Sequence, residues 1–190
     1  ARAISETLQP YVEQGKDIIA LVPSCALMMK FEWPLIVPDD ENVKSLSQAT
    51  YDITEYIVEL ANQEGISDGL SPLAGGITLH LACHARAQNM GPKGAEMLRL
   101  IPDADVSVVE RCSGHGGSWG IKKDNFEVAT KFARQTVRKA ASAKTVFFAS
   151  ECPLAGKHIA QGLETLDGPA QEDVEALHPI QILAKAYGLV

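Results

Sequence analysis

The chain has 190 residues, of which 46% are apolar, enough for one compact domain with a sizeable buried core. Asp and Glu outnumber Lys and Arg by 24 to 17, giving a formal net charge of -7, which argues against a nucleic-acid-binding surface. No apolar stretch approaches the roughly 20 residues of a membrane-spanning helix, and no charged-then-apolar signal pattern opens the chain. We therefore expect a cytoplasmic protein with small-molecule or protein partners and no transmembrane segment of its own.

The N-terminal third of the chain begins with helical spacing that ends at Gly15. A strand is predicted over 18–22. A short helix from Ala26 is expected to stop before Pro34, because the residue before a proline avoids helical dihedral angles. The period of the next apolar residues predicts one long amphipathic helix over 43–64.

The rest of the chain alternates between strands and helices after a loop rich in glycine over 65–76. The predicted elements are strands over 77–82, 105–110 and 144–149, and helices over 95–100, over 124–142 and from about 154. A polar stretch over 164–175 precedes a terminal helix that starts at His178-Pro179. The strand runs are mainly apolar and are not divided into an apolar and a polar face, as in strands buried on both faces. The pattern predicts an α/β fold, with a parallel sheet flanked by helices on both faces in Rossmann-like half-domains.

The four cysteines of the chain each follow one of the predicted strands. They are Cys25, Cys83, Cys112 and Cys152. Because ligands of open α/β sheets bind beyond the carboxyl ends of the strands, four soft ligands at that edge are more typical of a cofactor site than of core packing. A chain of this size without a secretion signal has no need of disulfides, so metal binding or reduced thiols are favoured.

A glycine-rich loop follows Cys112 and reads Ser113-Gly114-His115-Gly116-Gly117. Glycines there let backbone N–H groups approach a bound group, such as the sulfides of a cluster or a phosphate. A dinucleotide site is disfavoured, because Trp119 stands where the motif needs its third glycine. We expect Trp119 to pack in the core.

Three histidines lie near the candidate cysteines. His84 and His115 each stand beside a candidate ligand, so either is able to complete a metal-binding set. For His84, helix capping or hydrogen bonding is an equal alternative, whereas the position of His115 in the glycine loop favours a functional role. His80 lies within a strand and is expected to be a buried residue with satisfied hydrogen bonds.

Taken together, the strand-end motifs resemble the cysteine-rich CCG domain family, which occurs in heterodisulfide reductase and in anaerobic glycerol-3-phosphate dehydrogenase. In that family, each half is marked by a single Cys, a Cys-Cys-Gly and a final Cys-x-x-Cys, and the halves usually occur in tandem. The matching segments are Leu79-His80-Leu81-Ala82-Cys83-His84, Glu110-Arg111-Cys112-Ser113-Gly114 and Glu151-Cys152-Pro153-Leu154-Ala155.

The resemblance implies that this chain is part of a larger polypeptide. Residues 41–190 correspond to a C-terminal CCG-type half, and residues 1–40, with Pro23-Ser24-Cys25, to the end of a preceding half. It also implies iron–sulfur clusters and electron transfer with a redox partner protein or subunit. Partners of the implied kind are a flavin dehydrogenase, a ferredoxin-type protein or a quinone-linked carrier, and through one of them the chain would be peripheral to the membrane.

The chain departs from the family pattern at two positions. Ser113 stands in place of the second adjacent cysteine, and Ala155 in place of the last cysteine. The resemblance therefore implies a metal site of three thiols, Cys83, Cys112 and Cys152, with Cys25 or a histidine as a further ligand. A [4Fe–4S] cluster, a smaller cluster and zinc all stay open. We expect an electron-transfer module of an oxidoreductase; the alternative is a cluster-free or zinc-bound subunit-interaction domain that retains the CCG fold.

Overall fold

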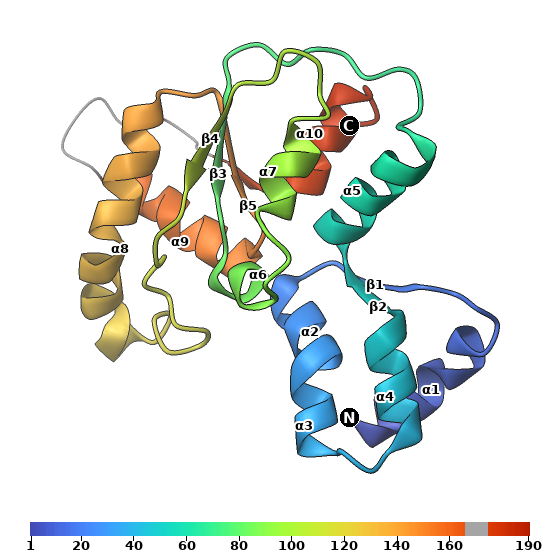
Figure 1. Ribbon diagram of the computed structural model, residues 1–190. Helices are drawn as coiled ribbons and strands as arrows, with labels where there is room; N and C mark the ends of the chain where they lie inside the picture. The colour runs from blue at the N-terminus through green and yellow to red at the C-terminus, as the bar shows by residue number, and fades with distance from the viewer. Residues whose placement is uncertain (166–174) are drawn as a thin grey trace.

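The computed structural model describes residues 1–165 and 175–190 and confirms the predicted α/β fold with parallel sheets. Within these residues the larger sheet has four strands in the order β4-β3-β5-β6, and all neighbours are parallel (Figure 1). Its strands are β3 (Ile77–His80), β4 (Val106–Val109), β5 (Phe147–Ser150) and β6 (Ala176–Leu177). A smaller sheet pairs β1 (Ile18–Ala20) with β2 (Thr50–Asp52), also in parallel.

Helices cover both faces of the four-stranded sheet (Figure 1). One face packs on α5 (Ile53–Glu64), α7 (Lys93–Leu98) and α10 (Pro179–Ala186). The other packs on α8 (Lys123–Ala143) and α9 (Pro153–Glu164). Successive strand residues point to opposite faces, so Phe148 joins the α8–α9 cluster and Ala149 the opposite one. Burial on both sides explains why these strands are predominantly apolar.

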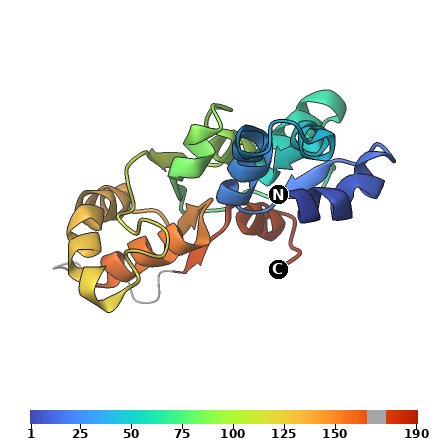
Figure 2. The same ribbon diagram turned by 90° about the horizontal axis from the view of Figure 1, so that it is seen from below.

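The N-terminal unit, residues 1–52, has its own small core of Trp33, Val37, Val43 and Leu46. It comprises the small sheet with α1 (Arg2–Val12), α2 (Pro23–Leu27), the π-helical turn η1 (Met28–Glu32), α3 (Trp33–Ile36) and α4 (Glu41–Ala49). Figure 2 shows this unit at the end of the molecule opposite α8 and α9. The pairing of β1 with β2 crosses residue 40, and the proposed division of the chain at that residue stays a prediction.

Two predicted helix boundaries in this unit are wrong. The single helix over 43–64 is interrupted, because the β-formers Thr50 and Tyr51 continue into β2 before Asp52 caps α5. Asp52 and Glu55 form a capping box that begins a new helix, α5. The apolar residues of α5 continue the spacing of those in α4, which is why the two helices resemble one in the sequence. The helix expected to stop before Pro34 instead continues, since Pro34 lies in the first turn of α3, where its missing N–H is not needed.

Smaller differences concern the rest of the chain. The strands are shorter than predicted, and α6 (Cys83–Ala87) and β6 were not predicted. The polar stretch over 164–175 lies largely outside the described residues. No helix in the described ranges is long and apolar enough to cross a membrane.

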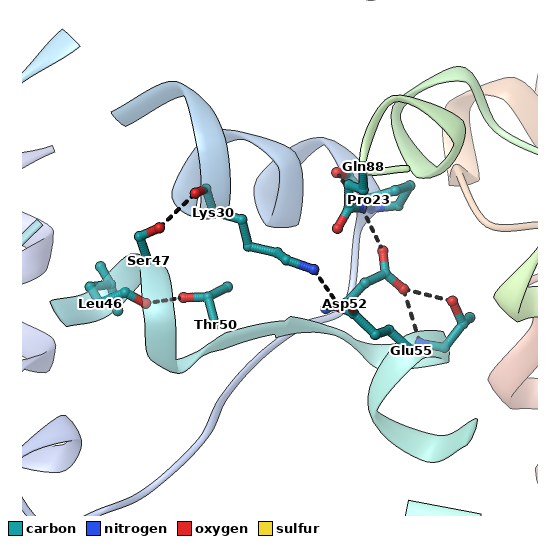
Figure 3. Close-up of polar contacts among 9 residues, drawn as sticks. Pro23, Lys30, Leu46, Ser47, Thr50, Asp52, Glu55 and Gln88 are labelled. Atoms are coloured by element: carbon teal, nitrogen blue, oxygen red, sulfur yellow. Dashed lines mark hydrogen bonds and ion pairs between the residues drawn. The ribbon is translucent and has the colours of Figure 1, made fainter. Parts of the chain in front are cut away.

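A buried polar network joins the N-terminal unit to the larger sheet (Figure 3). Lys30 pairs with Glu55 and both side chains are largely buried. Gln88 donates from Nε2 to Oδ2 of Asp52 at 3.1 Å and, more weakly, to the carbonyl oxygen of Pro23 at 3.4 Å. Because Gln88 directly follows α6, the N-terminal unit is anchored to the short helix that begins at Cys83.

Candidate functional site

Three of the four cysteines line one pocket at the carboxyl edge of the larger sheet. Cys83 begins α6 shortly after β3, Cys112 follows β4, and Cys152 stands between β5 and α9. Because these strands are parallel neighbours, their carboxyl ends meet at one edge. The pocket has a volume of about 90 Å³ and is lined by these three cysteines and by His80, Ala82, His84, Arg86, Arg111, Ser113, His115 and Ala155.

The thiols are free and accessible, and one accepts a backbone hydrogen bond. Cys83 and Cys112 are exposed, and Cys152 is partly so. The Gly114 N–H donates to Sγ of Cys112 at 3.3 Å. Gly114 has a φ of 79°, and a Cβ atom there would lie 2.4 Å from the carbonyl oxygen of Ala129 in α8. Glycine is therefore required for this loop to lie against α8 and present its N–H to the sulfur.

His80 connects the three segments that carry the pocket cysteines. Its Nε2 lies 2.9 Å from the carbonyl oxygen of Arg111 and its Nδ1 lies 2.9 Å from Oγ of Ser150. A carbonyl oxygen only accepts, so Nε2 donates and Nδ1 accepts from the Ser150 hydroxyl. The hydroxyl oxygen in turn accepts from the Cys152 N–H at 3.3 Å. Burial lowers the pKa of His80, in keeping with this neutral tautomer, and the prediction of a buried, satisfied histidine is confirmed.

Glu151 is a site residue that the sequence did not reveal. Its side chain is buried, and Oε2 accepts from the Ala82 N–H at 2.9 Å, which ties the end of β5 to the residue before Cys83. Burial raises the pKa of Glu151 to about 7, although the Ala82 N–H acts in the opposite direction. The available signal was a glutamate that directly follows an apolar strand, where an ionised side chain is unusual.

Ser113 and His115 both lie buried at the pocket. Ser113 Oγ and His115 Nδ1 are 3.4 Å apart, so the residue in place of the family's second cysteine contacts the histidine instead. Burial lowers the pKa of His115, with the nearby His158 and His84 acting in the same direction. His115 is therefore neutral at neutral pH, the form in which imidazole binds metals.

Cys25 and Trp119 lie elsewhere than the other candidates. Cys25 is exposed on α2 in the N-terminal unit and does not line the pocket. The strand before it, β1, pairs with β2 and is not part of the four-stranded sheet, so the structure brings three thiols together where the strand pattern suggested four. The expectation that Trp119 packs in the core is wrong, because its side chain is 43% exposed on a surface loop.

The thiols and imidazoles surround the pocket without converging on a single point. Within residues 1–165 and 175–190, no three His, Cys, Asp or Glu side chains are close enough together to hold one metal ion. A structural zinc site needs four ligands, each about 2.0–2.3 Å from the ion. The arrangement of these side chains is therefore not that of a preformed zinc site.

Sequence comparisons find relatives of the chain among known proteins, although no protein-family profile matches it. It is 23% identical over 174 residues to a subunit of the anaerobic glycerol-3-phosphate dehydrogenase of Escherichia coli K12, covering 91% of this chain and 41% of that protein. It is 30% identical over 122 residues to lactate utilization protein A of Geobacillus sp. WCH70, covering 58% of this chain and 48% of that protein. The chain thus spans about half or less of the length of these relatives. It is homologous to both proteins, which confirms the resemblance to the CCG type that its cysteine motifs indicated.

Proposed function

We propose that this chain is an electron-transfer module in which Cys83, Cys112 and Cys152 bind an iron–sulfur cluster. The observation that carries the proposal is that three neighbouring parallel strands deliver one thiol each to a common pocket. The names of the relatives, a dehydrogenase subunit and a lactate utilization protein, support a redox setting with a partner subunit.

The donor set suits a cluster better than a single ion. A cluster distributes its thiolates over several iron atoms, so ligands placed around a pocket are compatible with it, whereas zinc needs them at one point. Iron–sulfur clusters commonly take four protein ligands, and the pocket offers three thiols. We propose His115, which is neutral and lines the pocket, as the fourth ligand, with His84 as the alternative.

When bound, the cluster would accept and release single electrons, and the residues around it would set its reduction potential. The Gly114 N–H bonded to Cys112 Sγ favours the more negative, reduced state, because hydrogen bonds to ligand sulfurs are a main control of cluster potential. Arg86 and Arg111 line the pocket and act in the same direction. Arg86 is paired with Glu110 at 3.0 Å, so Arg111, which bonds Gln135, is the less neutralised of the two charges.

A second candidate function is a subunit-interaction domain that has kept the fold without a cluster. Ser113 and Ala155 favour it, because both line the pocket at positions where the CCG pattern has thiols. The hydrogen bonds that His80 and Glu151 form between the cysteine-bearing segments involve no thiol, so they would remain if the cluster were lost.

Metal analysis of anaerobically purified protein separates the two candidates. We expect iron and acid-labile sulfide in comparable amounts, and an EPR signal that changes on reduction with dithionite. Protein without iron or sulfide, both as isolated and after anaerobic reconstitution with ferrous iron and sulfide, would contradict the electron-transfer proposal. In that case, one equivalent of zinc would identify the zinc-bound form of the second candidate.

A further inference from the structure

A second and larger pocket lies between α8 and α9, apart from the cysteines. Its volume is about 460 Å³, within the range of small-molecule sites. Its walls combine an apolar part, from Phe126, Ala133 and Val137, with a polar part that includes Arg134, Arg138, His158 and Gln161. None of these residues lines the cysteine pocket.

His158 is the buried polar group of this pocket. Only 8% of the residue is exposed, and its Nε2 has no hydrogen-bond partner among the described residues. Its ring lies edge-on to Phe126, with the centroids 6.0 Å apart. Because Nε2 itself is closed to solvent, His158 contributes a buried ring to the pocket wall, and the exposed polar side chains of the pocket include those of Arg134, Arg138 and Gln161.

The two arginines give the pocket its charge. Arg134 and Arg138 are four residues apart on α8 and therefore lie on the same helix face, where like charges repel. In the part of the chain that the structure describes, neither forms an ion pair. The two guanidinium groups therefore favour an anion at this pocket.

We propose that the α8–α9 pocket binds a small molecule that carries a phosphate or carboxylate group on an apolar body. The oxyanion would be held by Arg134 and Arg138, whose planar guanidinium groups suit phosphate and carboxylate oxygens. The apolar body would lie against Phe126 and Val137. These contacts do not depend on a cluster at the cysteine pocket.

The site adjoins the cysteine loop through α8. A Cβ atom at Gly114 would come within 2.9 Å of the backbone nitrogen of Ala133, which also lines the larger pocket. His158 is close enough to His115 for its charge to act toward a lower pKa of His115. A ligand between α8 and α9 is therefore one layer of residues away from the Cys112 loop.

Titration of the full chain with four probes tests the proposal by isothermal calorimetry. Phenyl phosphate and benzoate carry both the anion and the apolar body, inorganic phosphate carries only the anion, and phenol only the apolar body. We expect saturable binding of phenyl phosphate or benzoate, with the stronger of the two identifying the anionic group, and at least tenfold weaker binding of phosphate and phenol. The double variant Arg134→Gln/Arg138→Gln should bind the preferred probe with at least tenfold lower affinity. Lys139→Gln, on the same helix but outside the pocket lining, should change that affinity less than twofold.

Amide chemical-shift mapping of the unaltered protein gives a readout that does not depend on the variants. The preferred probe should shift resonances in 126–138 and 158–165. No saturable binding of phenyl phosphate or benzoate, shifts confined to other segments, or equal binding by a folded double variant and the unaltered protein would each overturn the proposal.

Discussion

The two parallel sheets of this chain are held in place by different forces. The four-stranded sheet is packed between apolar clusters on both faces. The two-stranded sheet has one small apolar cluster and relies on buried polar contacts around Asp52 and Glu55 (Figure 3). Three cysteines belong to the first sheet and Cys25 to the unit of the second. In this chain, a cysteine that follows a strand reaches the common pocket only where its strand belongs to the four-stranded sheet.

Removal of one thiol from each region should have the largest and most unequal effects. We expect Cys112→Ala to lower the iron content of reconstituted protein by about tenfold or more, because the cluster loses one of few ligands. Cys25→Ala should keep the iron content of the unaltered protein. Iron and sulfide analysis after anaerobic reconstitution measures both, and equal losses in the two variants would show that Cys25 belongs to the same site.

The next largest effect concerns the buried carboxyl group at the edge of the larger sheet. The pKa of Glu151 is about 7 in the folded protein against an ordinary value of 4.5, so the folded state holds this proton more tightly than the unfolded state does. Its contribution to stability is full below pH 4.5 and is lost as the pH rises through about 7. The loss amounts to roughly 3 kcal/mol, from the shift in pKa.

Glu151→Gln should remove this pH dependence, because an amide does not titrate and its oxygen still accepts from the Ala82 N–H. Urea unfolding of metal-free protein at pH 5 and pH 7.5 measures the effect. The buried histidines are common to both proteins, so the difference between the two pH profiles isolates Glu151. Parallel profiles would show that the carboxyl group titrates normally.

Where the N-terminal unit meets α5, the loss of one member of a buried ion pair should affect stability without affecting the iron content. Glu55→Ala leaves the largely buried Lys30 without its partner and removes half of the capping box of α5. We expect a loss of about 2 kcal/mol in the free energy of unfolding. Glu59→Ala, on the same helix without an ion pair in the described structure, should cost far less. Loss of iron in Glu55→Ala would mean that the two regions are not independent.

The smallest expected effect lies at the contact between the regions. Gln88→Ala removes the hydrogen bonds to Asp52 and Pro23 and should cost about 1 kcal/mol. Hydrogen exchange should become faster in β1 and β2 and stay unchanged in β3 and β5. Uniform acceleration across both sheets would indicate that they unfold together.

Much of the fold was predictable because apolar runs bounded by turns mark strands buried on both faces. The interruption of the predicted helix at residues 50–52 was not predictable, because the apolar period of α4 continues into α5 on the other side of β2. The only local signal there was the spacing of Asp52 and Glu55 in a capping box.

The thiols that line the pocket were predictable from the sequence, but the residues that support them were not. Cys83, Cys112 and Cys152 follow from the rule that parallel strands end at one edge. The roles of His80 and Glu151 depend on β3 lying between β4 and β5, and this strand order is a tertiary property that no local pattern contains. The same holds for Trp119, whose exposure is set by the path of its loop.

The hydrogen bonds of His80 and Glu151 have a consequence for how this site can change over time. They bind the three loops to one another through a hydroxyl, a carbonyl oxygen and backbone N–H groups, and no thiol takes part. The shape of the pocket and the side chains that face it are thus set by different residues. A substitution in the pocket lining, as at Ser113 or Ala155, would alter the available chemistry while the hydrogen bonds that hold the three loops stay in place.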